Sequence, residues 1–470
     1  MPAPNDRPIN AAGPVRPAVG KADGLRAGNR RLERAFLVGL GILVVIYLGM
    51  FAHYFMRTMI RRPFWDMYKY VMDYLEYPGS GSFLRYVWSP YSSTEHHQVW
   101  MRLLTAFDIE AFHGSAYPFL VVATASVAAV PALIAREVWR TDMSCDFKLT
   151  AVLVFVLLVM TTANVVDCSN PIEGIYPQTL FFVVLSIVLF ADAGKGGALG
   201  RLAGILAGMA AGFACAVGLA IWPILLWMAW RDGLGWKWIV GVALVGAAYV
   251  VGYVSGMPAS HSTTAFFGEM QFLVPSILLR VADYLLTFLG LPWTRAPALY
   301  VPGRIIGAAW LILGVAAILG RGFMKAPSSR LDRIALAMIA FSLITAVAAS
   351  IARTDEMQDG ILPVRYSVFV APIHLGLLCL ALPWLYRCWL DLRHRRVMQG
   401  AIAAAGGILL LQQVAVGEAA AFKAQAIRAA NERFAAGGDD PEIRSYVFYD
   451  LSFARKALDA MQRAGIYQDE

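Results

Sequence analysis

The chain has 470 residues, of which 59% are hydrophobic and only 15% are charged, and its mean hydropathy is +0.58. A soluble protein of this size needs more charge to cover its surface, so the composition excludes an ordinary soluble domain. It predicts an all-α, polytopic integral membrane protein. The net charge of +8 does not indicate a nucleic-acid partner, because the cations lie in alternate loops between apolar segments.

Apolar segments of membrane-spanning length recur along most of the chain, and we expect about eleven transmembrane helices. The first segment covers residues 35–55. The others are centred near Val122, Leu157, Leu185, Met209, Leu226, Val245, Leu313, Ile339, Leu375 and Ile408. Loops rich in Arg and Lys alternate with loops poor in them, which predicts a cytoplasmic N-terminus. We therefore expect a multi-pass protein of the bacterial inner (plasma) membrane with its polar clusters outside the cytoplasm.

Three domains are expected. Residues 1–34 form a disordered basic tail, residues 35–416 the transmembrane domain, and residues 417–470 a helical extracytoplasmic tail. Polar extracytoplasmic loops are expected at residues 56–113, 256–303 and 352–366. Two unusually short spans within residues 202–230 share a break between Gly218 and Pro223, which predicts a bent or re-entrant hairpin.

The first loop, residues 56–113, is too long for a simple connector, so it should carry its own structure. An amphipathic helix is expected over residues 65–77, ending at the Pro-Gly-Ser-Gly run of residues 78–81, and a second helix over residues 93–107. Their Trp and Tyr residues favour the outer membrane interface.

Asp66 stands just beyond the first span, at the start of the first expected helix. A carboxylate there can act as a general base that deprotonates an acceptor hydroxyl, or as a ligand for a divalent cation. The alternative is a structural acid that caps its own helix, because acids near helix N-termini are favoured electrostatically.

Glu95, His96 and His97 form a second candidate group in the same loop. A carboxylate and an imidazole at a helix start can share a proton, bind a metal or orient a phosphate. Adjacent histidines face different ways on a helix, so we expect only one of them to share a site with Glu95. The alternative is a solvated helix start.

The third loop ends in Arg365 and Tyr366 at the entry of an apolar span, with Arg353 at the loop's beginning. Arginine binds phosphate through two parallel hydrogen bonds, which favours a phosphate site at this position. The alternative is an arginine that pairs with Asp355 or Asp359 and fixes the loop. An active site outside the cytoplasm has no access to nucleotide sugars or ATP, so a donor would have to be lipid-linked.

Together these features resemble the C-type glycosyltransferase superfamily of multi-spanning enzymes that use polyprenyl-phosphate-linked sugars. The pattern there is an acid in the first extracytoplasmic loop, here Asp66 within PFWDMYKYVMDYL. The segment EHHQVWMRLLTAFDIEAFHG is similar to a stretch of a bacterial branch that has Glu-His-Arg, and this chain departs from it at His97. GLAIWP and VRYSVF resemble later landmarks of that branch.

The resemblance implies inverting transfer of a sugar from a polyprenyl-phosphate donor to a glycan, lipid or protein acceptor. Asp66 would be the base, Glu95 and His96 would orient acceptor or lipid phosphate, and Arg365 with Arg353 and Tyr366 would bind the donor phosphate. The residues expected in secondary or acceptor-binding roles are His97, Arg102, Asp73, Trp65 and Tyr70. No cofactor is required by this interpretation, and a divalent cation stays open.

Two other functions are weighed against it. A polymerase or ligase of lipid-linked glycans relies on Arg and His clusters in a large later outer loop, whereas residues 256–303 are poor in them and contain His261, Arg280 and Arg295. A transporter or lipid flippase requires ionisable residues buried in mid-span and paired discontinuous helices. The apolar segments here carry almost no such residues.

Overall fold

The computed structural model describes residues 19–89, 97–192, 197–255, 275–291, 293, 299–323, 329–352 and 364–467. These residues form helices and no β-strand, which confirms the all-α prediction for this part of the chain. The helices up to the middle of the chain are α1 (Val19–Thr58), α2 (Met67–Ser80), α3 (Phe83–Trp88), α4 (Val99–Phe112), α5 (Tyr117–Trp139), α6 (Cys145–Val159), η1 (Thr162–Asn164), α7 (Val165–Ser169), α8 (Ile175–Phe190), α9 (Gly197–Ala214), η2 (Ala216–Ala220), α10 (Ile221–Arg231) and α11 (Trp236–Val254).

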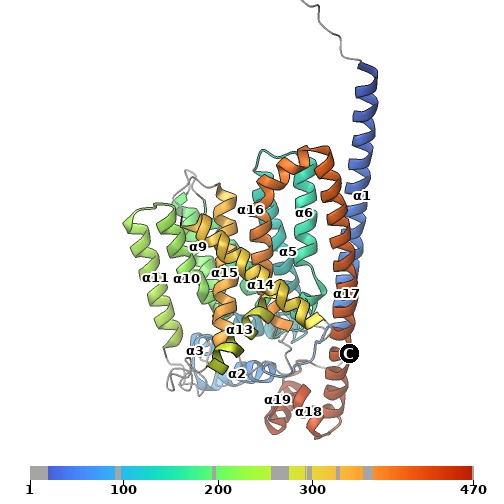
Figure 1. Ribbon diagram of the computed structural model, residues 1–470. Helices are drawn as coiled ribbons and strands as arrows, with labels where there is room; N and C mark the ends of the chain where they lie inside the picture. Colours follow the sequence, from blue (N-terminus) through green and yellow to red (C-terminus); the bar gives the residue numbers. More distant parts are fainter. Residues whose placement is uncertain are drawn as a thin grey trace, which may run out of the picture.

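The second half continues with α13 (Pro275–Leu289), α14 (Tyr300–Ala317), the π-helical turn η6 (Ile318–Gly322), α15 (Arg330–Ala352), η8 (Val364–Phe369), α16 (Ala371–Leu390), α17 (Leu392–Ala435), α18 (Pro441–Tyr446) and α19 (Leu451–Ala464). The long helices lie side by side, and the short helices α2, α3, α18 and α19 gather at the lower end of Figure 1. This lower end carries the first loop.

The number of spans differs from the prediction. Eight described helices are long and apolar enough to cross a membrane, and nine spans result if α6 and the η1–α7 segment, bent by 42°, form one broken span. The expected count of about eleven is not confirmed. All eleven expected segments are helical, but α8 and the segment Ala216–Arg231 are shorter apolar helices. The 16 residues of α8 rise only about 24 Å, less than the roughly 30 Å of a hydrocarbon core.

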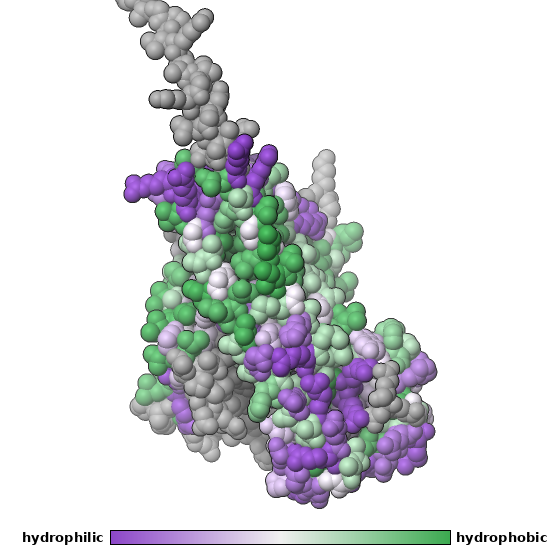
Figure 2. All heavy atoms as spheres, turned by 90° about the vertical axis from the view of Figure 1, so that its right-hand side faces the viewer, coloured by the Kyte–Doolittle hydropathy of each residue, from purple (hydrophilic) through white to green (hydrophobic). Residues whose placement is uncertain are grey.

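The first and last long helices, α1 and α17, pack against each other along one side of the molecule (Figure 1). Small residues permit this approach, because a Cβ atom at Gly406 would lie 2.4 Å from Leu43 Cδ2 and one at Gly417 would lie 2.4 Å from the Tyr54 ring. Figure 2 shows this side of the molecule, with an apolar band between two polar ends. The band is typical of a surface that faces lipid.

Both predicted domain boundaries fall inside helices. α1 begins at Val19, so part of the expected disordered tail, residues 19–34, is helical. α17 runs without a break through the expected boundary at residues 416–417 and ends at Ala435. Arg recurs in the first of these segments and Ala in the second, and the high helix propensity of both residues lets each helix continue past its apolar part.

The broken span between α6 and α7 is closed by a glutamine of α17. At the break, Gln413 Oε1 accepts hydrogen bonds from the Thr162 backbone N–H and from Thr161 Oγ1, the latter at 3.2 Å, while Gln413 Nε2 donates to the Met160 carbonyl at 3.3 Å. These backbone groups at the break are thus satisfied by protein, as an apolar environment requires.

The expected break between the two short spans is present. The helical turn η2 separates α9 from α10, and Gly218 lies in it. A Cβ atom at Gly218 would lie 2.2 Å from the backbone carbonyl of Ala211, so only glycine allows the turn to pack against α9.

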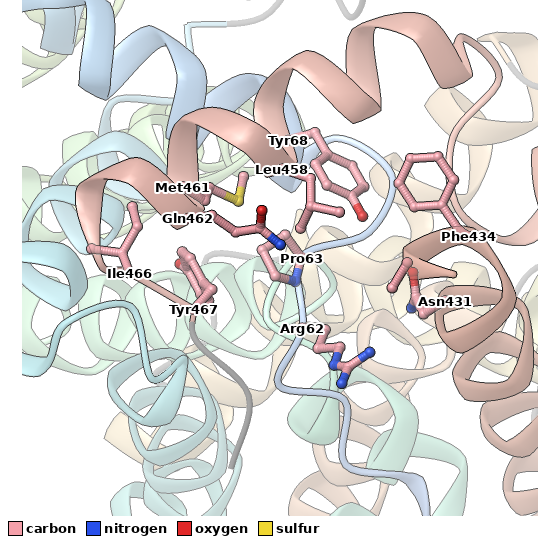
Figure 3. A pocket seen from close by; sticks show the side chains of 11 residues that line it. Arg62, Pro63, Tyr68, Asn431, Phe434, Leu458, Met461, Gln462, Ile466 and Tyr467 are labelled. Atoms are coloured by element: carbon pink, nitrogen blue, oxygen red, sulfur yellow. The ribbon is translucent and has the colours of Figure 1, made fainter. Parts of the chain in front are cut away.

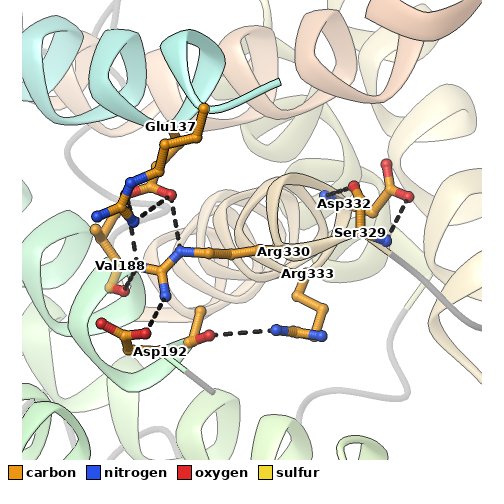
Figure 4. Close-up of polar contacts among 9 residues, drawn as sticks. Glu137, Val188, Asp192, Ser329, Arg330, Asp332 and Arg333 are labelled. Atoms are coloured by element: carbon orange, nitrogen blue, oxygen red, sulfur yellow. Dashed lines mark hydrogen bonds and ion pairs between the residues drawn. The ribbon is translucent and has the colours of Figure 1, made fainter. Parts of the chain in front are cut away.

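Ion pairs join the basic loops that connect the membrane-spanning helices (Figure 4). Arg330 donates to the buried Glu137 carboxylate at 2.7 Å and pairs with Asp192 at 3.0 Å, and Arg140 also pairs with Glu137 at 3.2 Å. These contacts bring together three of the loops whose Arg and Lys content predicted that they share one side of the membrane. Arg333 similarly pairs with Asp232.

Candidate functional site

The first loop folds into three short helices. The helix expected over residues 65–77 is observed as α2, which continues through Pro78 and ends at Ser80, three residues later than expected. The second expected helix is observed as α4, which begins only at Val99, and residues 93–96 lie outside the described part of the chain. The helix α3 between them was not predicted.

Helix α2 is buried on two faces by different parts of the chain. Met67 and Tyr70 belong to a buried cluster with residues of α4 in the same loop and of the membrane-body helices α5 and α8. Tyr68 and Val71 belong to a second cluster, which joins the end of α17, α18 and α19 to residues of α3 and α4. Tyr68 and Tyr70, two positions apart, point in roughly opposite directions from the helix axis, so the short loop helix lies between the C-terminus and residues of α4, α5 and α8.

We define the C-terminal lobe as residues 418–467, the segment that follows the membrane-spanning part of α17. It is anchored at its start by Glu418, which pairs with Arg57 at 2.6 Å and accepts a hydrogen bond from Tyr54 at 3.0 Å. At its end, the Tyr467 hydroxyl donates to Asp108 at 2.9 Å. The expected helical tail is therefore docked onto the first loop (Figure 1).

The backbone at the entry of α2 is held in an uncommon conformation. Trp65 has a φ of +47°, a value that bulky residues rarely adopt, and its N–H donates to the Val447 carbonyl of the lobe at 2.6 Å. Asp66 follows at the N-cap of α2, yet its side chain makes no capping hydrogen bond to this helix. The capping hydrogen bond is thus absent, while the position of Asp66 at the N-cap is the one where the helix dipole favours an acid, so the structural alternative stays open.

Tyr70 lies one turn after Asp66 and is the centre of a buried polar cluster. Its hydroxyl donates to the Gln98 side chain. Burial raises the pKa of Tyr70 well above its ordinary value, and the nearby Asp66 carboxylate raises it further, while Arg102 acts in the opposite direction. Tyr70 therefore stays protonated and is able to donate a hydrogen bond.

Arg102 of α4 supplies positive charge to this cluster. Its side chain is only 1% exposed, donates to Asp73 at 2.8 Å, and lies over the rings of Tyr70 and Tyr86 at 5.9 and 5.1 Å from their centroids. Among the described residues its Nε atom has no hydrogen-bond partner. Cation–π contacts and a carboxylate thus hold a guanidinium inside the loop.

Tyr176 of α8 links this cluster to the entry of α16. Tyr176 is close enough to Tyr70 to contribute to the raised pKa of that residue. The centroid of its ring also lies 6.2 Å from that of the Tyr366 ring in η8. Tyr366 is buried and also packs on Phe288 of α13 at 5.8 Å. The first and third polar loops, which are far apart in the sequence, are therefore brought together through tyrosine rings. Arg353 and the side chain of Arg365 lie outside the described residues.

The acid–histidine group is described only at its last member. His97 is buried, with Nδ1 2.7 Å from the Trp88 carbonyl oxygen and Nε2 3.1 Å from the Ser255 carbonyl oxygen. These contacts join α3 to the end of α11 and occupy both ring nitrogens. Glu95 and His96 lie outside the described residues, so their expected partnership with Asp66 stays a prediction.

Asp108 is not among the predicted site residues, yet it connects three elements. Its carboxylate accepts hydrogen bonds from the Ala116 N–H at the start of α5, from Ser115, and from Tyr467 of the lobe. Burial raises its pKa to about 6, and these hydrogen bonds oppose the shift. Its partner Tyr467 is 359 positions away, and no local pattern reveals such a contact.

The described part of the chain holds no group of three or more His, Cys, Asp or Glu side chains arranged to bind a metal ion. No protein-family model, curated protein or solved structure matches this chain. The chemistry of the site has to be argued from the residues themselves.

Proposed function

We propose that the chain is a membrane glycosyltransferase that moves a sugar from a polyprenyl-phosphate donor to an acceptor hydroxyl outside the cytoplasm. In this reaction the acceptor oxygen attacks the anomeric carbon while Asp66 takes the hydroxyl proton. The bond between that carbon and the phosphate oxygen breaks with inversion, and polyprenyl phosphate leaves.

The observation that carries this proposal is the setting of the Asp66 carboxylate. It lies close enough to Tyr70 to raise the pKa of that residue, in a cluster that also contains Asp73 and Arg102. An acid in such a cluster, at the end of the membrane helices, suits a base for a substrate with a lipid tail. The strained backbone at Trp65 supports this proposal, since such strain is common at functional sites.

The donor phosphate is assigned to the region of Tyr366. This residue lies near Tyr70 through the Tyr176 ring, at the entry of α16. Arg365 precedes it in the sequence and is the proposed phosphate ligand, with Arg353 as a second one. Aromatic rings such as Trp65, which is 41% exposed, offer faces for sugar rings.

A transporter is the main alternative from another class, and the broken span α6–α7 is a feature it would share. In a transporter, broken helices offer their free backbone groups to the substrate. Here Gln413 forms hydrogen bonds at the break with the Met160 carbonyl, Thr161 and the Thr162 N–H. This favours a structural break. A polymerase or ligase shares the donor chemistry and is distinguished by its product.

The proposal is tested with the purified full chain in lipid nanodiscs. Polyprenyl-phosphate hexoses carrying labelled glucose, mannose or galactose are supplied together with a mixture of methyl glycosides as acceptors, and transfer of label from the lipid fraction to the acceptors is measured. We expect release by the wild type, and a loss of about 10²–10⁴-fold in Asp66→Asn, the range expected when a general base is removed. Glu76→Gln is the matched control, because Glu76 lies on the same helix and pairs with Lys456 of the lobe at 3.4 Å.

Full activity of Asp66→Asn would sink the assignment of the base. Movement of intact labelled lipid across liposome membranes without sugar release would establish the transporter instead. A product with many added sugar units on one acceptor would indicate a polymerase.

A further inference from the structure

Two features of the molecule are not used by the proposed reaction. One is the cavity of about 200 Å³ between the C-terminal lobe and the entry of α2, lined by side chains such as Tyr68 and Phe434 (Figure 3). The other is the exposed surface of α13 and of the start of α14, two helices that pack against each other (Figure 1). The cavity results from the packing of the lobe, whereas the surface of α13 and α14 is open to the surroundings of the protein.

Helix α13 differs from the membrane-spanning helices. With 15 residues, it is not among the described helices that are long and apolar enough to cross a membrane. In its second half Tyr284 and Phe288 are fully buried, whereas in its first half Leu278 is 51% and Leu279 is 71% exposed. One half of the helix is therefore held by the protein, and the other half projects from it.

The projecting half of α13 carries a cation next to its exposed leucines. Arg280 is exposed and forms no hydrogen bond or ion pair with any described residue. A helix that exposes leucine beside arginine is typical of the membrane interface, where the leucines enter the acyl region and the arginine stays at the level of the headgroups. The first half of α13 thus suits contact with lipid.

Arg304 of α14 brings a second guanidinium to the same surface. Its Nη2 donates to Asp283 of α13 and to the Tyr300 hydroxyl, and its Cζ lies 3.9 Å from the centroid of the Tyr300 ring. The side chain is still 31% exposed. Its Nη1 has no hydrogen-bond partner in the described part of the chain and is not buried. The N–H groups of Nη1 are therefore open to an acceptor from outside the protein.

Helices α13 and α14 together carry one net positive charge. Their only charged residues are Arg280, Asp283 and Arg304. Asp283 lies three positions after Arg280, so the two side chains are neighbours on one face of α13. The same carboxylate pairs with Arg304. A single acid thus serves two guanidinium groups, and an anion from outside can bind where the acid does not.

Exposed aliphatic side chains surround these cations. The span that begins with α14 has 17% of its most apolar stretch buried inside the protein, the smallest share among the eight spans of the described residues. Val301 and Ile305, close to Arg304 in the sequence, are 64% and 66% exposed. Arg304 stands four residues after the start of this span, which is a rise of about 6 Å along the helix. Its guanidinium can therefore reach the headgroups while its neighbours contact acyl chains.

This combination is complementary to an anionic lipid. Guanidinium groups bind phosphate oxygens through charge-assisted hydrogen bonds, and basic pockets on membrane helices are known to bind anionic headgroups. A soluble anion would leave the exposed leucines and isoleucine of α13 and α14 without a partner. An amphiphile covers both parts of the surface.

We propose that α13 and the start of α14 form a binding site for one anionic phospholipid of the surrounding bilayer, with its phosphate on Arg280 and Arg304. The acyl chains lie on the exposed aliphatic side chains of both helices. The proposal goes beyond the proposed function and does not depend on it. Phe288 of the same helix packs on Tyr366, so the lipid would hold α13 beside the entry of α16.

The site is tested with the purified full chain in nanodiscs of phosphatidylcholine. A trace of phosphatidylglycerol with a photoreactive diazirine in its acyl chain is added, and cross-linked peptides are identified by mass spectrometry. The comparison probe is phosphatidylcholine with the same acyl chain. In the wild type we expect the anionic probe to label α13 and the start of α14 about fivefold more, the ratio that corresponds to about 1 kcal/mol for one charge near a membrane surface.

Substitutions of the charged residues set the direction of the effect. Arg280→Gln should lower labelling by the anionic probe about fivefold, and Arg280→Lys, which keeps the charge, should retain most of it. Asp283→Asn should raise the labelling about fivefold, because it removes the acid that competes for both guanidinium groups. A loss of folding cannot produce these opposite signs. Arg463→Gln is the matched control, since Arg463 is an exposed arginine of the lobe without a partner among the described residues.

The proposal is overturned if both probes label α13 equally, or if Arg280→Gln leaves the labelling unchanged. It is also overturned if an equal amount of polyprenyl phosphate removes the anionic label, which would make the surface a donor site. Removal of the label by inorganic phosphate would overturn it too, because the site would then bind soluble anions. The labelling requires no sugar transfer, so its result is independent of the test of the proposed function.

Discussion

Two polar clusters at opposite ends of the molecule are built on different principles. At one end, Glu137 is 3% exposed and receives both Arg140 and Arg330, and Arg330 also pairs with Asp192 (Figure 4). At the other end, the carboxylates of Asp66 and Asp73 both raise the pKa of Tyr70. Among the described residues, the guanidinium of Arg102 lowers it. In the first cluster the acids are paired with arginines, whereas in the second two acids lie near a buried tyrosine hydroxyl.

The contrast is between a structural lock and the candidate site. A buried acid that receives two arginines is already neutralised and serves to tie loops together. A protonated tyrosine beside two carboxylates combines a hydrogen-bond donor with possible proton acceptors, the groups that general acid–base chemistry uses. Four changes test this contrast, the first with the largest expected effect.

Glu137→Gln should be the most destabilising. The change removes the shared partner of Arg140 and Arg330, and breaking a buried ion pair from one side costs about 3–5 kcal/mol. We expect a lower thermal unfolding midpoint in detergent, with sugar release per folded molecule unaffected. Asp192→Asn is the control, because Asp192 is 46% exposed and its loss should cost less than about 1 kcal/mol. Equal effects of the two changes would contradict the structural lock.

The stability of the protein should depend on pH because of Asp108 in the first loop. Its folded pKa of about 6 exceeds the ordinary value of 3.8, so between these two values the folded state holds a proton that the unfolded state has lost. Stability should therefore fall as the pH rises through this window, by at most about 3 kcal/mol. Unfolding midpoints of the wild type and Asp108→Asn across the same pH range measure it, and the drop should be smaller in the variant. Parallel curves would contradict the assignment.

Removing either partner of the Arg102–Asp73 ion pair should lower the stability of the protein, but by unequal amounts. Asp73→Asn leaves a guanidinium that is 1% exposed without its carboxylate and should cost about 3 kcal/mol. Arg102→Met leaves an acid that is 44% exposed, which water can hydrate, and should cost only about 1–2 kcal/mol. Unfolding midpoints of both variants give the order, and the reverse order would show that the stacking on Tyr70 and Tyr86 dominates.

The smallest expected difference in stability is between two substitutions of Trp65, each of which serves as the control for the other. Trp65→Ala and Trp65→Gly both remove the ring, but only glycine adopts a φ of +47° without strain. Trp65→Gly should therefore be more stable than Trp65→Ala by about 1 kcal/mol. Equal unfolding midpoints would mean that the backbone at this position relaxes when the ring is removed.

Much of the fold follows from local pattern. The apolar segments are long enough to form helices wherever they occur, and the amphipathic pattern after Trp65 predicts α2 to within a few residues. The break at Gly218 is also visible, because a glycine and a proline interrupt an apolar run. The number of spans is less predictable, since a segment such as α8 is apolar throughout but short.

The site is harder to predict because its contacts join distant parts of the chain. The apolar positions Leu451, Ala454 and Met461 predict the helix α19 but do not reveal that its partner is α2. The same holds for Asp108 and Tyr467, which meet only after both ends of the chain are in place. An acid at Asp66 is visible in the sequence, but its proximity to a buried tyrosine and to Arg102 of another helix is not.

The pairing of α1 with α17 has a consequence for the order of folding. Translation produces the first loop before the helices that cover α2 and accompany α1, which follow all the other helices that the structure describes. Until then α2 has only one of its two apolar faces packed, and the glycines of α17 have not yet met α1. A nascent chain therefore inserts its spans before the first loop acquires its final shape, and damage to the C-terminal lobe should lead to a fully inserted protein that is recognised as incompletely folded.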